Sequence, residues 1–370
     1  MLDKEQVLQA LRGVEDPELH KSVVELNMVR DIQIEGDRVS LEVVLTIQGC
    51  PLKAVIEEQV TKALQQIGAS EVDVRLGAMT DAQRAQLAER LRAERSGQAV
   101  GTAQAQSPQK SALLSEGSST RFIAITSGKG GVGKSTVTVN LAVALARAGY
   151  KVGLIDADIY GFSVPEMMGI EQRPTVIDNL ILPVERLGVQ VISMGFFVED
   201  NAPVVWRGPM LGKMLRNFFN EIHWDRLDYL LLDLPPGTGD IAMDVHSLLP
   251  KCEEIVVTTP HATAAFVAAR AGAMARKMKH EILGVVENMS FMRCHQCGHK
   301  EFVFGQGGGE RLARELDCAL LAQIPLGLPE YSEEEQEAAS AIYKADSEAG
   351  KIFADLALLL TKGLTASKIL

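Results

Sequence analysis

A phosphate-binding loop is the part of this chain with the clearest chemistry. Its glycines let successive backbone N–H groups curl around phosphates, which a Cβ would obstruct. Lys134 is expected to reach the β- and γ-phosphates, and the Ser135 hydroxyl to bind Mg²⁺. An apolar segment at 121–126 precedes the loop and an apolar helical pattern at 137–148 follows it, with a helix N-terminus facing the anion. Residues 128–135 match GxxxxGK[ST], and together with Thr136 they are the expected nucleotide ligands: Gly128, Lys129, Gly130, Gly131, Val132, Gly133, Lys134, Ser135 and Thr136.

Carboxylates suited to phosphoryl transfer follow two other apolar segments. Asp233 ends the run at 230–232, and Asp156 follows 153–155. Phosphoryl transfer needs Mg²⁺ and an oriented water, so we expect Asp233 to hold the metal through water, Asp156 to lie near it and Asp158 to position the water. A helix-capping aspartate at 233 and surface charges in the other loop are the alternatives.

Lys129 gives the loop a second cation directly after its first glycine. The backbone wraps the other way there, so this side chain does not easily reach the phosphates of its own loop. Across a symmetric dimer it could reach the phosphates of the partner. Where an arginine is supplied in trans in this way, it raises the rate of phosphoryl transfer about a thousandfold or more. A solvated loop lysine is the alternative. Lys129, Lys134 and Asp158 are therefore the candidate catalytic residues.

Cys294 and Cys297 form a CxxC followed by Gly298, a spacing that lets both thiolates bind one metal centre. Two thiolates are only half of a tetrahedral four-cysteine site, and the chain has no second CxxC. A two-fold dimer would complete the set, because each subunit contributes the same half-site. The shared centre could be a [4Fe–4S] cluster or zinc.

Two further interpretations of the cysteine pair stay open. His295 and His299 could complete a zinc knuckle within one chain, and the thiols could do redox chemistry. Of the remaining cysteines, Cys50 precedes a predicted helix. The N-terminus of a helix lowers the pKa of a thiol, so Cys50 could be reactive. The alternative is that it is a small buried residue. Cys252 and Cys318 are expected in the core.

Composition limits the classes of protein that fit. The 370 residues suffice for about two domains, and 46% hydrophobic residues support a large core. A net charge of −11 argues against binding to nucleic acid or to anionic membranes. The chain has no apolar run long enough to span a membrane, and its start lacks a signal-peptide pattern. We therefore expect a cytoplasmic protein.

The pattern of elements predicts an α/β fold with a small N-terminal α/β domain at 1–79. A charged helix at 80–95 and a polar, flexible linker fill 80–119. From 120 to 370, alternating strands and helices predict a mostly parallel, doubly wound sheet, with ligands at the carboxyl ends of its strands. The expected strands are 121–126, 151–156, 189–194, 228–233, 254–259, 282–288 and 320–324, and the clearest helices are 134–148, 262–279 and 308–316.

Taken together, these motifs resemble the Mrp/ApbC iron–sulfur cluster carriers. These are deviant-Walker ATPases, as are nitrogenase iron protein and the Min and Par positioning ATPases. The resemblance covers essentially all of 121–362, and residues 1–79 resemble the MIP18-type domain that often precedes such an ATPase. The similar segments are the loop with its extra lysine, 156–161, 206–210, 233–240, and 288–290 followed by the cysteine pair, with 16–19 and 46–51 in the first domain.

The resemblance implies a homodimer that holds a bridging [4Fe–4S] cluster on Cys294 and Cys297 and delivers it to apo iron–sulfur proteins, in contact with cluster assembly scaffolds. It also implies weak ATP hydrolysis, with Asp158 near the attacking water and Asn288 against the adenine. Phe162 departs from the family, which usually has proline there. The alternative function is a positioning ATPase with a structural zinc site, and the apolar segment 352–360 is either a closing core helix or a membrane-binding tail.

Overall fold

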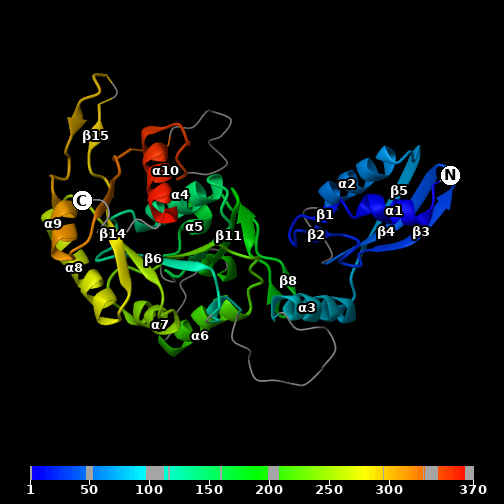
Figure 1. Cartoon of the computed structure of the whole chain (residues 1–370), viewed down its shortest axis with the longest axis horizontal. Coiled ribbons are helices and arrows are strands. Elements are labelled where there is room, and N and C mark those ends of the chain that lie inside the picture. Colours follow the sequence, from blue (N-terminus) through cyan, green and yellow to red (C-terminus); the bar gives the residue numbers. More distant parts are fainter. Residues whose placement is uncertain are drawn as a thin grey trace. The chain divides into compact units, whose positions relative to one another are not determined.

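The computed structural model describes residues 2–46, 53–96, 112–115, 117–158, 161–198, 208–294, 296–327, 329 and 341–362. These residues form two compact units (Figure 1). One unit falls within 1–107 and 175–182, and the other within 108–174 and 183–370. Each contains both helices and a sheet, and the mixed α/β class is therefore confirmed.

The first unit is a three-stranded sheet packed against helices. Its sheet has the order β3-β4-β5, in which β3 and β4 are antiparallel and β4 and β5 are parallel. Apolar residues alternate along β4, which buries Val39, Leu41 and Val43 on one face of the sheet. The elements are α1 (Lys4–Leu11), α2 (Lys53–Gln66), α3 (Asp81–Ser96), β1 (Glu15–Asp16), β2 (Lys21–Ser22), β3 (Val29–Glu35), β4 (Arg38–Leu45), β5 (Glu71–Ala78), β8 (Val176–Ile177) and β9 (Leu180–Ile181).

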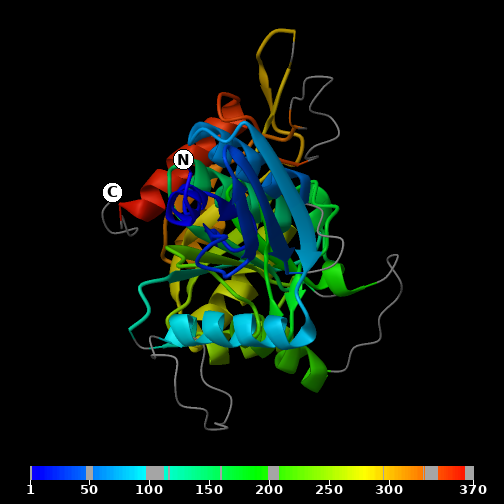
Figure 2. The same cartoon turned by 90° about the vertical axis from the view of Figure 1, so that its right-hand side faces the viewer.

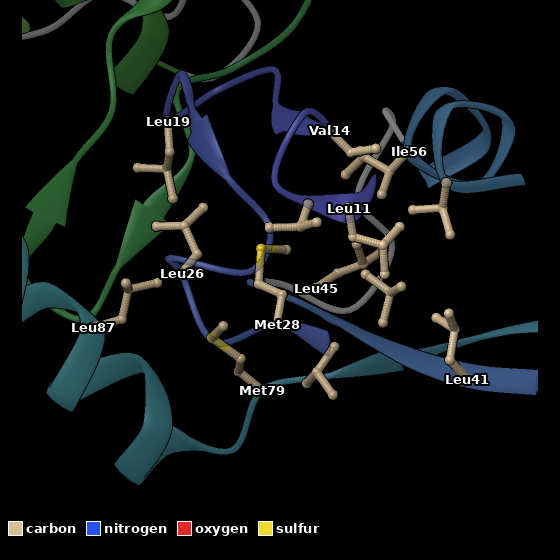
Figure 3. Close-up of a cluster of buried hydrophobic side chains, with 14 of the residues drawn as sticks. Leu11, Val14, Leu19, Leu26, Met28, Leu41, Leu45, Ile56, Met79 and Leu87 are labelled. Atoms are coloured by element: carbon tan, nitrogen blue, oxygen red, sulfur yellow. The ribbon is translucent and has the colours of Figure 1, made fainter. Parts of the chain in front are cut away.

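Helix α3 and a hairpin from later in the chain complete the core of this unit, part of which is shown in Figure 3. The helix expected at 80–95 is present as α3, and its buried residues Leu87 and Leu91 join this core. The β8–β9 hairpin adds Ile177 and Leu180, about a hundred residues later in the chain.

The second unit is built on an eight-stranded sheet of order β10-β11-β7-β12-β6-β13-β14-β17. Only the edge strand β10 is antiparallel to its neighbour, so the predicted mostly parallel sheet is confirmed. Its strands are β6 (Arg121–Ser127), β7 (Val152–Asp156), β10 (Val184–Arg186), β11 (Val189–Ser193), β12 (Tyr229–Asp233), β13 (Glu253–Thr258), β14 (Glu281–Glu287) and β17 (Leu320–Gln323). A separate hairpin pairs β15 (Met292–Arg293) with β16 (Lys300–Glu301).

Helices cover both faces of this sheet. In Figure 1, α4, α5 and α10 lie above it and α6, α7 and α8 below it, and Figure 2 shows the same layers from the side. The helical elements are η1 (Ala112–Leu114), α4 (Lys134–Arg147), α5 (Val164–Met167), η2 (Met194–Phe197), α6 (Gly208–Asn220), α7 (Asp240–Leu248), α8 (Ala262–Lys277), α9 (Gly308–Glu315) and α10 (Glu348–Thr361). The first of these, η1, lies within the segment expected to be a flexible linker, and its Leu113 is buried.

The apolar C-terminal segment is a core helix. Helix α10 packs on α4 and buries Phe353, Leu356 and Leu360, as the closing-helix interpretation predicts. Among the described residues, every helix is too short or too polar to cross a bilayer.

Candidate nucleotide site and thiolate pair

The phosphate-binding loop connects the central strand β6 to α4, and two of its glycines are required for steric reasons. Gly133 has φ of +77°, and a Cβ there would lie 2.1 Å from Nδ2 of Asn288. A Cβ on Gly128 would lie 2.3 Å from the backbone nitrogen of Ala268 in α8. The loop can therefore keep this path between two neighbouring elements only with glycine at both positions.

Lys134 and Asp233 form a buried ion pair at the carboxyl ends of β6 and β12. The distance from Nζ to Oδ1 is 2.7 Å, and the side chains are 6% and 1% exposed. Asp233 also accepts hydrogen bonds from the hydroxyls of Ser135, at 2.6 Å, and Thr138, at 2.7 Å. The lysine, the serine and the carboxylate predicted to act on phosphate and Mg²⁺ are thus brought together.

Asp156 lies fully buried beside this network. Its carboxylate accepts hydrogen bonds from the Ser193 hydroxyl at 3.0 Å and from the backbone N–H of Ser163 at 3.2 Å. Burial, and then the charge of Asp233, raise the pKa of Asp156 to about 7. The charge of Lys134 acts in the opposite direction but does not offset them.

Asp158 is half-buried, and its backbone N–H donates to Oδ1 of Asp156 at 3.2 Å. Lys129 is exposed on the loop, and its carbonyl accepts a hydrogen bond from the Ser127 hydroxyl at 3.1 Å. Phe162, the departure from the family pattern, packs beside Gly195, where a Cβ would lie 2.7 Å from its ring. Asp156 and Asp158 both lie at the carboxyl end of β7.

Gly237 lies in the loop that follows β12. Its backbone N–H donates to the Ser127 carbonyl at 2.8 Å, and its φ is +89°. The loop after β12 is thereby fastened to the end of β6.

Asn288, expected against an adenine, follows β14 and is 5% exposed. Its Nδ2 donates to the Val132 carbonyl at 3.0 Å, so it supports the phosphate-binding loop directly. An adjoining pocket of about 250 Å³ is lined by the loop residues Lys129, Gly130, Gly131 and Val132, by Thr259, His261, Thr263 and Met289, and by Phe304. Phe304 reaches this pocket from the segment that follows the cysteine pair.

Cys294 and Cys297 lie on the turn of the β15–β16 hairpin, which projects from the second unit in Figure 1. Gly298 has φ of +71°, a conformation suited to glycine, and its N–H donates to the Cys294 carbonyl at 2.8 Å. Arg293 fixes the base of the hairpin by pairing with Glu348 at 2.6 Å and donating to the Gly298 carbonyl at 3.0 Å.

The environment of Cys294 favours its thiolate. Hydrogen bonds from the backbone N–H groups of Cys297 and Gln296 lower the pKa of Cys294, and the Cys297 side chain adds to the effect. Cys294 is half-buried and Cys297 is exposed. The pair can therefore bind a soft metal centre that stays accessible to a second protein.

The other cysteines have different surroundings. Cys252 is buried, and burial raises the pKa of its thiol. Cys318 is partly buried at the edge of the core, and burial raises its pKa to about 11. Both suit the predicted packing role. Cys50 and His295 lie outside the described residues, and His299 is exposed.

Sequence reasoning missed Thr138 and Ser193, which hydrogen-bond to the two buried aspartates. Each had a signal. Thr138 lies one helical turn after Lys134 on the same face of α4, and Ser193 ends a buried strand at the edge of the sheet where ligands gather. The missing step was to pair each hydroxyl with a carboxylate.

Comparison with protein-family models gives two matches. Residues 118–360 match a model described as "ParA: NUBPL iron-transfer P-loop NTPase". Residues 4–76 match one described as "Iron-sulfur cluster assembly protein".

Two named proteins match most of the chain, and a solved structure matches about two thirds of it. A Bacillus subtilis protein named iron-sulfur cluster carrier protein is 48% identical over 96% of this chain and 97% of its own length. A protein of the same name from Mycobacterium leprae is 47% identical over 87% of this chain and 83% of its own. A solved structure of a nucleotide-binding protein from Archaeoglobus fulgidus in complex with ADP covers 64% of this chain and 87% of its own, with 35% identity and a TM-score of 0.50.

Proposed function

The chain belongs to the family of NUBPL iron-transfer P-loop NTPases, and from this premise we propose that it is an ATP-dependent carrier of iron–sulfur clusters. One observation carries the proposal: a complete phosphate-binding loop and a cysteine pair with one exposed thiol occur in the same compact unit. The similar proteins from Bacillus subtilis and Mycobacterium leprae carry the name of this function.

The cluster is the cargo, and Cys294 and Cys297 are its proposed ligands. One chain supplies two thiolates where a [4Fe–4S] cluster has four ligand positions, so we propose a homodimer in which each protomer supplies half. The backbone N–H groups directed at Cys294 stabilise a thiolate ligand. The exposure of Cys297 allows an acceptor thiol to replace it during transfer.

The nucleotide site has the groups for a slow ATPase. The Ser135 hydroxyl and the Asp233 carboxylate, 2.6 Å apart, are hard oxygen donors of the kind Mg²⁺ prefers, and they would hold the ion. Bound Mg²⁺ would neutralise negative charge on the phosphates. Lys134 would release Asp233 and bind the β- and γ-phosphates. Asp158 would orient the attacking water. Lys129 would contact the phosphates bound to the partner.

Phe304 offers a route by which nucleotide affects the cluster. It lies seven residues after Cys297 and forms part of the pocket that adjoins the phosphate-binding loop. We propose that this pocket takes the nucleoside, with Asn288 close by. A nucleotide that contacts both the loop and Phe304 would then favour one position of the cysteine hairpin over others. Coupling between nucleotide and cluster requires such a difference in contact between two states of the protein.

The first unit is proposed to recruit assembly scaffolds or apo acceptors in the cytoplasm. Its match to the iron–sulfur cluster assembly model supports this role. The proposed recruiting domain is 1–79 together with α3 and the β8–β9 hairpin, which pack in the same core. The rest of 80–119 is proposed as the linker, and 120–370 apart from that hairpin as the ATPase domain.

The alternative, a positioning ATPase with a structural zinc site, makes a different prediction for the cysteines. Anaerobic reconstitution with iron and sulfide should give a [4Fe–4S] spectrum by UV-visible and Mössbauer measurement, with four irons per dimer. The Cys294→Ala/Cys297→Ala variant should stay apo under the same conditions. Zinc on this pair, with no iron uptake, would reject the carrier proposal.

A further inference from the structure

Three buried side chains with metal-binding atoms lie together outside the nucleotide and cysteine sites. They are His246 near the end of α7, Glu254 in β13 and His280 just before β14. Their side chains are 3%, 1% and 0% exposed. Three elements that are separate in the sequence therefore direct one ligand atom each into the same dry position.

The three ligand atoms form a nearly equilateral triangle. Nδ1 of His246 lies 2.9 Å from Nδ1 of His280, and Oε1 of Glu254 lies 3.2 Å and 3.0 Å from them. Zinc binds imidazole nitrogen and carboxylate oxygen at about 2.0–2.2 Å, so two donors on one tetrahedral ion lie about 3.3–3.6 Å apart. The triangle is therefore within a few tenths of an ångström of the size that a single zinc ion requires.

While Glu254 is ionised, protons alone do not make all three contacts favourable. Suppose that His280 donates its Nδ1–H to Glu254 and shares it with His246. The lone pair on His246 Nδ1 then faces Glu254 Oε1 at 3.2 Å. If both rings donate to Glu254, two N–H groups face each other at 2.9 Å. A cation at the triangle attracts all three atoms at once.

The other ring nitrogen of His280, Nε2, is buried without a hydrogen-bond partner in the part of the chain that the structure describes. It is unfavourable with or without a metal, because a metal-bound imidazole usually donates its other N–H to an acceptor. The three ligand atoms, and not this nitrogen, indicate the metal.

We propose that His246, Glu254 and His280 form a buried structural zinc site. Two imidazoles and a carboxylate suit zinc, and the second oxygen of Glu254 supplies a further donor on the same residue. The ion would fasten α7 to the sheet. Because α7 begins where the loop after Asp233 ends, the site would also stabilise the base of that loop. The site contains no thiolate, so it is independent of the cluster.

The test is metal analysis of the full chain in a Cys294→Ala/Cys297→Ala background, which removes the cysteine site. The expected result is one zinc per chain, falling at least tenfold in His246→Gln and in His280→Gln. His299→Gln, on the cysteine hairpin, is the matched control and should keep its zinc. Cobalt substitution should give d–d bands without a thiolate charge-transfer band.

A second measurement needs no substitution in the site, so it remains valid if the histidine variants do not fold. Chelator-treated protein of the same cysteine-free background should regain thermal stability when zinc is added, and not when magnesium is added. The proposal is overturned if this protein carries no zinc and gains no stability from it. It is also overturned if zinc remains in His280→Gln.

Discussion

Replacing Lys134 by methionine should destabilise the nucleotide-free protein, in addition to abolishing ATP binding. Lys134 is the cation nearest to Asp233, at 2.7 Å, and both side chains are almost fully buried. Methionine preserves the length of the side chain and removes only the charge. The variant therefore leaves a buried carboxylate without its counter-ion, next to the second buried carboxylate of Asp156.

The magnitude follows from the burial of the pair. Removing one partner of a buried ion pair costs about 3–5 kcal/mol, because the remaining charge is uncompensated. Asp233 keeps hydrogen bonds from Ser135 and Thr138, which places the expected loss at the lower end, about 3 kcal/mol. Replacing Asp233 by asparagine in the same chain removes the stranded charge. The double variant should therefore recover about half of the loss or more.

The assay is urea unfolding without nucleotide, followed by tryptophan fluorescence. The chain has two tryptophans, Trp206 and Trp224. Trp224 is buried in the second unit, so its signal reports on the unit that contains the pair. Lys129→Met is the matched control. This lysine belongs to the same loop but is exposed, so its loss should change the free energy of unfolding by less than about 0.5 kcal/mol.

Two outcomes would refute this reasoning. One is a Lys134→Met variant that loses less than about 1 kcal/mol, because such a small loss is typical of an exposed pair. The other is a double variant with Asp233→Asn that is no more stable than Lys134→Met alone. Either result means that the buried pair does not set the stability of the loop.

Three further predictions test other parts of the site. Gly133→Ala should lower the free energy of unfolding by about 2 kcal/mol, because its Cβ meets Asn288 and its φ is positive; Gly130→Ala, which meets open space, should change it little. The raised pKa of Asp156 means that the folded state binds the proton of this carboxyl group more tightly than the unfolded state does. The free energy of unfolding, measured with urea, should therefore fall as pH rises from 3.8 to about 7, and it should fall less in Asp156→Asn. Phe304→Ala should weaken ATP binding about three- to tenfold by calorimetry, because its ring would pack on the base; unchanged affinity would show that the base does not contact Phe304.

The parallel sheet of the second unit could be predicted because its strands are buried on both faces. Such strands appear as continuous apolar runs, and the predicted bounds of β6, β7 and β12 differ from the observed ones by at most one residue. The loop and the strand-end aspartates could then be placed, because parallel strands all direct their carboxyl ends to one edge.

The other parts of the fold and of the sites could not be predicted, because they depend on contacts between segments that are distant in the sequence. Strand β3 is half-buried and rich in charged residues, and it has no apolar run that marks it as a strand. The β8–β9 hairpin joins a core about a hundred residues earlier in the chain, and no local pattern indicates that partner. The same holds for His246, Glu254 and His280, since only the packing of α7 against the sheet brings them together.

The most direct test of the central claim is cluster transfer from the reconstituted protein to an apo iron–sulfur enzyme, followed by the return of the activity of that enzyme. Transfer should occur from the wild-type protein, change in rate when ATP is added, and be lost in Cys294→Ala/Cys297→Ala. In Lys134→Met it should no longer respond to ATP. Transfer that survives loss of both cysteines, or that is indifferent to ATP in the wild-type protein, would contradict an ATP-dependent carrier.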